Sequence, residues 1–147
     1  MESKHENLWG YMKRLRFVQQ VIAESFPHRP ADSLRVLDVG CGNGSELALP
    51  LARLGFQVTG IDIHAPSIEH ARQLGAGVTN LSYVCGPVEE LKSPPYDIVI
   101  LSEDLEHLRE PRVLLSAAVA HLNKNGIIIV TVPNGYGEFE MDSWLFR

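Results

Sequence analysis

The chain has 147 residues, of which 45% are hydrophobic and 21% charged, and its formal net charge is −5. These values predict one globular domain, and the acidic balance argues against nucleic acid as a partner. No apolar run is long enough to span a membrane, and no signal core follows Met1, so we interpret the chain as cytoplasmic. The two cysteines, Cys41 and Cys85, are expected to be small buried residues in a reducing compartment, not a disulfide.

The first predicted element is a helix over residues 7–26, where apolar side chains recur at steps of three and four residues. Lys13, Arg14 and Arg16 lie together near its middle. This cluster favours a solvated face on a packing helix. The alternative is a helix that covers a cofactor and offers basic groups to an acidic substrate. Prolines 27 and 30 end the helix.

The chain is organised around residues 34–44, a short strand that leads into a glycine-rich turn. Residues 34–39 are apolar at almost every position, as in a strand that is covered on both faces. Three glycines then alternate with other residues over 40–44, so a ligand can lie against the backbone itself. A helix is predicted to begin directly afterwards. Together these features indicate the nucleotide-binding corner of a doubly wound parallel sheet.

The charges around this corner argue against a bound phosphate. A dinucleotide fingerprint would have its third glycine where Ser45 stands, with a pyrophosphate on the helix N-terminus. Glu46 in the first helical turn, and Asp38 before the glycines, would repel such a group. The corner therefore favours a nucleoside without phosphates, preferably one with positive charge. S-Adenosylmethionine, with its sulfonium, ammonium and bare ribose, has these properties.

The stretch from Asp38 to Gly44 consists of an acidic residue, one further residue and then G-x-G-x-G. It resembles the first motif of the class I S-adenosylmethionine-dependent methyltransferases. The resemblance covers about residues 34–134 and implies an α/β, Rossmann-like fold with a doubly wound parallel sheet of order 3-2-1-4-5. It also implies S-adenosylmethionine as cofactor and S-adenosylhomocysteine as product. The glycine-loop residues expected to bind this cofactor are Asp38, Gly40, Cys41 and Gly42.

The second strand, over residues 56–62, follows a helix over 46–54 in which Pro50 predicts a kink or a start delayed to about Leu47. Asp62 stands at the carboxyl end of this strand, where a carboxylate can accept both ribose hydroxyls. The alternative is that Asp62 caps the next helix. The resemblance implies the ribose role for Asp62, and it implies that Ile63 packs on the adenine face.

A third strand is predicted over residues 81–84, and the loop after it corresponds to the loop that holds the adenine edge in the family. The family often has an acidic side chain directly after the glycine of this loop, whereas Pro87 stands here. We therefore expect the adenine contacts to come from Pro87 and the Val88 backbone, with an acid such as Glu89 nearby.

A continuous apolar run over residues 98–101 predicts a central parallel strand, and Ser102 follows at its carboxyl end. Ligands of open α/β sheets bind outside these ends, so Ser102 is a candidate for the methionine end of the cofactor. Glu103, Glu106 and His107 come next and would share one face of a helical turn. This set suits a general base or a divalent metal.

The L-E-H at residues 105–107 resembles that of ubiquinone-type O-methyltransferases. We take His107, with Glu106 beside it, as the catalytic candidate, a structural histidine being the alternative. We assign no metal, and Glu103, Glu106 and His107 are the residues that would hold one. The leading hypothesis is methyl transfer to a small-molecule acceptor, with oxygen preferred over nitrogen. The alternatives are a cofactor-binding module or incomplete methyltransferase without independent activity and, third, an NAD-dependent oxidoreductase.

The last predicted elements are a helix over residues 111–122, closed by 123–126, and a fifth strand over 127–132. The usual family fold continues with another helix and an antiparallel strand pair, so we expect a fragment or a minimal form. Its parts are an N-terminal helix or lid (1–30), a cofactor-binding core (31–134) and a tail (135–147). The fifth strand would be an exposed edge. We expect homodimerisation through this edge, or masking by a tail that contains Trp144, Leu145 and Phe146, and we favour association because ordering the tail costs entropy.

Overall fold

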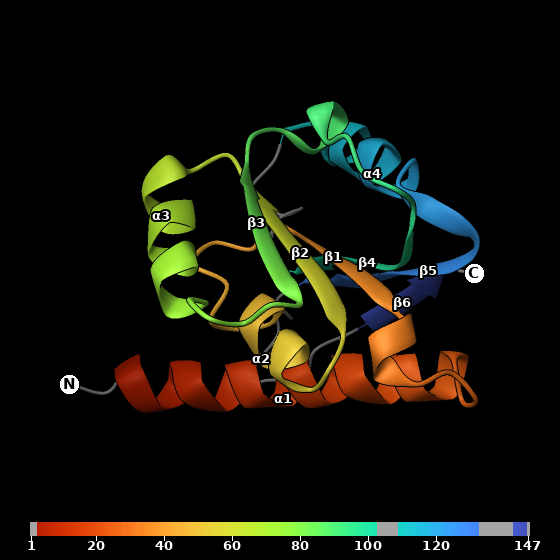
Figure 1. Cartoon of the computed structure of the whole chain (residues 1–147), viewed down its shortest axis with the longest axis horizontal. Coiled ribbons are helices and arrows are strands. Elements are labelled where there is room, and N and C mark those ends of the chain that lie inside the picture. Colours follow the sequence, from red (N-terminus) through yellow and green to blue (C-terminus); the bar gives the residue numbers. More distant parts are fainter. Residues whose placement is uncertain (1–2, 103–108, 133–142, 147) are drawn as a thin grey trace.

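The computed structural model describes residues 3–102, 109–132 and 143–146, with side chains described over 12–102 and 109–132. The elements in chain order are α1 (Ser3–Ser25), η1 (Ala31–Ser33), β1 (Arg35–Val39), α2 (Ala48–Arg53), β2 (Gln57–Asp62), α3 (Ala65–Leu74), β3 (Leu81–Cys85), η2 (Val88–Glu90), β4 (Tyr96–Ser102), α4 (Pro111–Val119), β5 (Leu122–Thr131) and β6 (Ser143–Phe146). Figure 1 shows a single sheet with helices on both sides. Over the described ranges, none of the helices combines the length and the apolar character that a membrane crossing requires.

The sheet has the order β3-β2-β1-β4-β5-β6, and β1 to β5 are parallel to one another. The predicted order of 3-2-1-4-5 is therefore confirmed. Asp38 of β1 lies opposite Gly60 of β2 and Ile100 of β4, and Asp62 lies opposite Cys85 of β3. This register brings the carboxyl ends of four strands to one edge of the sheet, where the chain then turns into its loops.

The expectation that the fifth strand forms the edge of the sheet is wrong. β6 pairs antiparallel with β5, with Ile128 opposite Phe146 and Thr131 opposite Ser143. Of the two alternatives weighed for this edge, masking by the tail is the one observed within the chain, although association had been favoured. The reason is that β5 offers a complete row of backbone hydrogen-bonding groups, which offsets the entropy of ordering a short strand.

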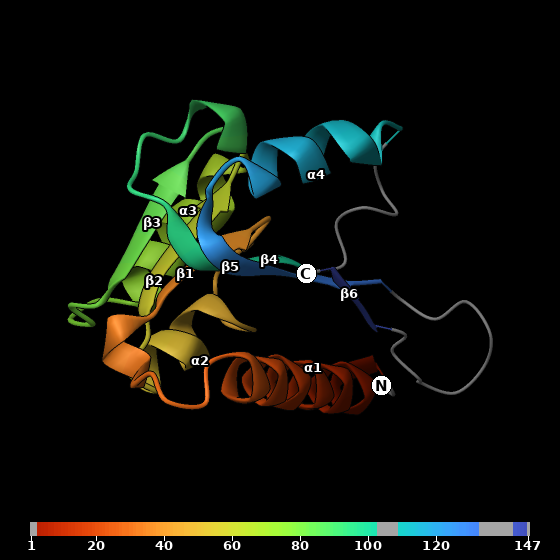
Figure 2. The same ribbon diagram turned by 90° about the vertical axis from the view of Figure 1, so that its right-hand side faces the viewer.

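Side chains alternate between the two faces of the sheet and divide the core into two clusters. Val36, Ile98 and Ile129 pack on one face with residues of α1 and α2. Leu37 and Val99 pack on the other face with residues of α4 and η2. Figure 2 shows α1 and α2 below the sheet and α4 above it. Because both faces are covered, the central strands are apolar at successive positions.

Asp97 joins three segments near the amino ends of the parallel strands, where β4 begins. Its Oδ1 accepts hydrogen bonds from Arg29 Nη1 at 2.7 Å and from Asn123 Nδ2 at 3.1 Å, and its Oδ2 accepts from Arg35 N at 2.9 Å. Burial alone would raise the pKa of Asp97. The hydrogen bonds from Arg29, Arg35 and Asn123, together with the Arg29 charge, lower the pKa of this carboxyl below its ordinary value. Asp97 therefore acts as an ionised structural hub.

Candidate functional site

The glycine turn after β1 folds over the end of β2. The backbone N–H groups of Gly40 and Cys41 both donate to the Ile61 carbonyl, at 2.8 Å and 3.1 Å. Gly40, Gly42 and Gly44 have φ angles of 70°, 55° and 71°. Residues with a side chain rarely adopt such angles, so this conformation accounts for the alternate glycines in the sequence.

The Asp62 carboxylate fastens this turn from β2. Its Oδ2 accepts a hydrogen bond from Gly42 N at 2.8 Å, and its Oδ1 accepts one from His64 N at 2.8 Å. His64 is the N-cap residue of α3, and no side-chain hydrogen bond caps this helix, so the contact with His64 N shapes the turn before α3. Each carboxylate oxygen has a further lone pair, which leaves acceptor capacity for ribose hydroxyls. The sequence analysis missed the contact between Asp62 and Gly42.

The Tyr83 ring of β3 lies beneath the glycine turn, in a slot that glycines leave open. A Cβ at Gly60 would lie 2.8 Å from both Cys41 Sγ and the Tyr83 ring, and a Cβ at Gly44 would lie 2.1 Å from Tyr83 Oη. Burial, with a smaller contribution from the charges of Cys41 and Asp38, raises the pKa of Tyr83 well above its ordinary value. Gly44 and Gly60 are therefore required by packing, apart from any ligand.

Two cavities adjoin the turn, and Gly40 lines both of them. The larger, of about 510 Å³, lies between Ile63, the loop that contains Val88, and the start of α4 at Val113. Most of its lining surface is apolar, although Asp62, Glu89, Arg109 and Glu110 also line it. The smaller, of about 250 Å³, lies between Arg14 of α1, the glycine turn and the end of β4, and three charged side chains line it. The two cavities thus differ in chemistry and meet at the glycine turn.

The structure brings every predicted cofactor-binding residue to one of these cavities. The residues at the larger cavity are Gly40, Asp62, Ile63, Pro87 and Val88. The residues at the smaller cavity are Asp38, Gly40, Cys41, Gly42 and Ser102. Their placement follows from the register of β1, β2 and β4, which end at the same edge of the sheet.

The catalytic candidates His107 and Glu106, and the metal candidate Glu103, lie outside the described residues. Across the part of the chain that the structure describes, no group of three or more His, Cys, Asp or Glu side chains could hold a metal ion. Ser102 Oγ, just before this segment, lies 2.9 Å from Thr131 Oγ1 at the end of β5. A pair of hydroxyl groups therefore joins the carboxyl ends of β4 and β5 beside the smaller cavity.

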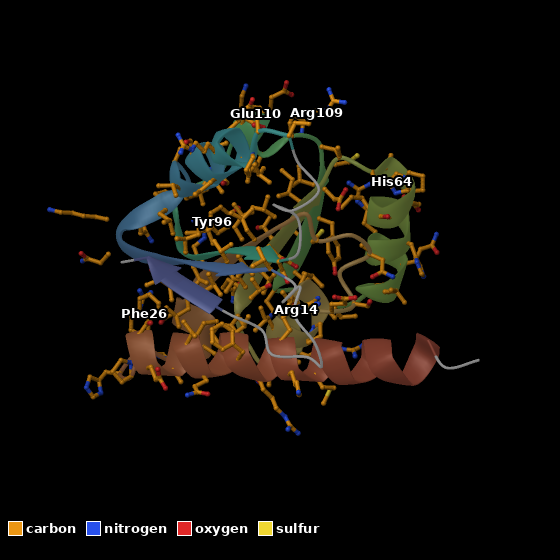
Figure 3. The ribbon with its side chains drawn as sticks, turned by 180° about the vertical axis from the view of Figure 1, so that it is seen from behind. Arg14, Phe26, His64, Tyr96, Arg109 and Glu110 are labelled. Atoms are coloured by element: carbon orange, nitrogen blue, oxygen red, sulfur yellow. The ribbon has the colours of Figure 1, made fainter. Side chains whose placement is uncertain are left out.

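Arg14 is a functional candidate that the sequence analysis did not single out. Arg14 is only 8% exposed. Its Nη1 forms an ion pair with Oε2 of Glu46, which follows the glycine turn. Figure 3 shows Arg14 pointing from α1 towards the sheet. The favoured solvated face is wrong for Arg14, although Arg16 is exposed. Helical spacing could have shown that Arg14 faces inward, because Arg14 lies four residues before the buried Val18 and therefore shares its face of α1.

Cys41 and Cys85 are not joined by a disulfide in the structure. Cys41 is half-buried within the glycine turn, but Cys85 is exposed, which contradicts the expectation that both are buried. The cause is the position of Cys85 at the end of β3, which is an outer strand of the sheet.

Comparison with known proteins places the chain in a family. A family model described as a methyltransferase domain matches residues 8–146. The ubiquinone biosynthesis O-methyltransferase of Azorhizobium caulinodans is 37% identical over 132 residues, which cover 82% of this chain and 51% of that protein. The protein of the same name from Rickettsia typhi is 38% identical over 131 residues, covering 86% and 53%. The chain thus spans about half the length of the curated relatives it matches.

Solved structures with the same fold carry more than one chemistry in their names. The magnesium protoporphyrin IX methyltransferase of Synechocystis PCC 6803 with bound SAM has a TM-score of 0.68 at 24% identity, over 83% of this chain and 60% of that one. The cyclase SpnF has a TM-score of 0.65 at 26% identity, over 78% of this chain and 43% of that one. The family match and the curated relatives decide the membership: this chain belongs to the methyltransferase-domain family.

Proposed function

We propose that this chain binds S-adenosylmethionine and transfers the methyl group of this cofactor to an oxygen atom of a small-molecule acceptor. The observation that carries the proposal is the pair of cavities that meet at Gly40, one with a mostly apolar lining surface and one with a more polar lining. The cofactor has the same division, with an adenosine at one end and a zwitterionic amino acid at the other. Relatives named as O-methyltransferases, at 37% identity, support the choice of oxygen.

The larger cavity suits an adenosine. Ile63 is 77% exposed although it is a large apolar residue, and it lines this cavity. A buried adenine ring would cover it and remove apolar surface from water. Asp62, its neighbour, has acceptor capacity left for the ribose hydroxyls. The site therefore fits the adenosine part of the cofactor without any phosphate.

The smaller cavity suits the amino-acid end. The Arg14 guanidinium is the donor for a carboxylate, and a bidentate contact of this kind is strong. Asp38 and Glu46 line the same cavity and supply negative charge for an ammonium and a sulfonium. We assign α1 as the cover over this end of the cofactor. The same two carboxylates oppose a pyrophosphate, which argues against NAD.

When bound, the cofactor supplies an electrophilic methyl group on its sulfonium. The chain must then align the acceptor in line with the methyl–sulfur bond and exclude water. An acceptor hydroxyl also loses its proton, and we propose His107 as the base, with Glu106 beside it. Its place in the sequence supports this, since it follows Ser102 of the smaller cavity by five residues.

The second candidate function is a cofactor-binding module or incomplete methyltransferase without independent activity. The observation that favours it is the likeness to the cyclase SpnF, because this fold alone does not decide the reaction.

Calorimetry with S-adenosylhomocysteine and with NAD tests the cofactor, and we expect binding of the first only. Incubation with methyl-labelled S-adenosylmethionine and a panel of phenols, catechols and amines tests the reaction. Labelled phenolic ethers are the expected product. Binding without labelled product from any acceptor would establish the binding module instead, and binding of NAD alone would overturn the assignment.

A further inference from the structure

We infer that His121 positions the adenine-binding loop from outside the cavity and thereby sets the preference of the site for adenine. The inference rests on the proposed function. His121 lies in the turn between α4 and β5, and it lines neither of the two cavities at the glycine turn. It is therefore a positioning residue, acting on the ligand only through the loop.

The ring of His121 holds the backbone of the loop directly. His121 Nε2 lies 2.8 Å from the Val88 carbonyl oxygen. A carbonyl only accepts, so Nε2 carries the proton and donates. The backbone of His121 is fixed as well, because its own carbonyl accepts from Tyr96 N at 2.8 Å at the start of β4. The imidazole that donates to the loop is therefore attached to the sheet through its own backbone.

The loop has a second attachment on its other side. Gly86 N donates at 3.0 Å to the backbone carbonyl of Asp62, the residue whose side chain is proposed to hold the ribose. Within the loop, Leu91 N donates to the same Val88 carbonyl at 3.2 Å, which closes the short turn η2. The Val88 side chain is buried and packs in the cluster that contains Ala118 of α4. The loop is therefore held between β2 and the α4–β5 turn.

These attachments fix which groups of the loop face the cavity. The loop residues that line it are Gly86, Pro87, Val88 and Glu89, the N-terminal part of the segment. Glu89 directly follows Val88, so the hydrogen bond from His121 to the Val88 carbonyl fixes the peptide that joins the two residues and, with it, the backbone of Glu89 at the cavity.

The Glu89 carboxylate at this cavity is an acceptor, which matches the N6 amino group of adenine. Hypoxanthine has an acceptor, O6, at the same position, and two acceptors facing each other repel. A Glu89 backbone that is fixed through His121 thus favours adenine over hypoxanthine, and a loosened backbone favours it less.

The test compares two variants of equal side-chain length, His121→Gln, which keeps a donor, and His121→Met, which does not. His70→Met on the exposed face of α3 is the control. Calorimetry gives Kd for S-adenosylhomocysteine and for its hypoxanthine analogue, S-inosylhomocysteine, and thermal melting checks folding. We expect His121→Met to weaken binding of the adenine ligand about three- to tenfold with little change for the analogue, while the Gln variant stays near the parent.

An unchanged ratio of the two Kd values in a folded His121→Met variant would overturn the inference. Equal losses for both ligands, or failure of both His121→Met and His121→Leu to fold, would show a general structural role and would also overturn it. Binding of the parent protein to the two ligands is measured before any variant is made. If the parent binds neither ligand, the proposed function itself is wrong.

Discussion

The Gly42 N–H donates a hydrogen bond to Asp62 Oδ2 at 2.8 Å, so the carboxylate proposed for the ribose also fixes the glycine turn. Gly42 lies in the turn that follows β1, and Asp62 is the last residue of the adjacent parallel strand β2. One side chain thus couples the shape of the turn to the contact with the ligand. A change at Asp62 is expected to act on both.

The first prediction concerns that coupling. Asp62→Ala leaves the Gly42 and His64 N–H groups without their acceptor and removes the proposed ribose contacts. We expect S-adenosylhomocysteine binding to lose about 1–3 kcal/mol, and the unfolding free energy to fall by about 1–2 kcal/mol. Calorimetry and urea denaturation measure the two. Asp32→Ala, an exposed acid in η1, is the matched control, and equal behaviour of both variants would contradict the assignment.

The second prediction concerns a glycine that lines neither cavity. Gly60→Ala brings a Cβ within 2.8 Å of the Tyr83 ring and of Cys41 Sγ in the turn. We expect about 1–3 kcal/mol of destabilisation and weaker S-adenosylhomocysteine binding, since Cys41 must move. Gly77→Ala, where φ is 84° and nothing lies nearby, should cost stability through strain and leave the Kd unchanged. A parental Kd for Gly60→Ala would show that the turn does not depend on this packing.

Much of the fold could be predicted because the signals were local. The apolar runs at β1 and β4, the glycines at positive φ and the acid at the end of β2 each reflect a constraint within a few residues. The start of β5 was misjudged for the same reason. Residues 123–126 resemble the end of a helix, but β5 begins at Leu122. Pairing of Leu122 with Tyr96 of β4 sets the start of the strand. Tertiary pairing here overrides local preference.

The missed parts of the site are contacts between segments far apart in the sequence. Arg14 meets Glu46 because α1 packs against the sheet beside the glycine turn, and spacing along α1 alone could show only that Arg14 faces inward. The contact between His121 and Val88 joins two turns and leaves no pattern in either. Such pairs follow from the packing of the elements, which a single sequence does not encode in any short motif.

The third prediction concerns Arg14. Arg14→Met removes the guanidinium proposed for the carboxylate and keeps much of the packing of the stem. We expect about tenfold weaker binding of S-adenosylhomocysteine, and no change for 5′-methylthioadenosine, which lacks the amino-acid end. Arg16→Met, two positions away and exposed, should affect neither ligand. Equal losses for both ligands in Arg14→Met would place the effect on the fold and not on the carboxylate.

The fourth prediction uses the lowered pKa of Asp97. A carboxyl whose pKa is lower in the folded than in the unfolded chain stabilises the fold above its unfolded pKa, about 3.9, and this contribution is lost as the pH falls through the folded pKa. Asp97→Asn should therefore reduce the unfolding free energy by about 1.5–3 kcal/mol at pH 7. The difference from the parent should shrink below pH 4. Urea denaturation at pH 7 and pH 3 measures it, and a constant difference would contradict the ionised hub.

The last prediction concerns the edge that β6 covers. Deleting residues 143–147 removes the strand that pairs with Ile128 to Thr131 and exposes the backbone groups of a buried, apolar strand. An edge of this kind pairs with other chains. We expect the shortened chain to associate more strongly than the parent at equal concentration, as measured by light scattering. Amide exchange over residues 128–131 should quicken at the lowest concentrations and slow again as the chains associate. A control that replaces Trp144 and Phe146 by Ala keeps the backbone of β6, and it separates backbone pairing from side-chain cover. A shortened chain that stays monomeric with parental protection at 128–131 would show that β6 is not what covers this edge.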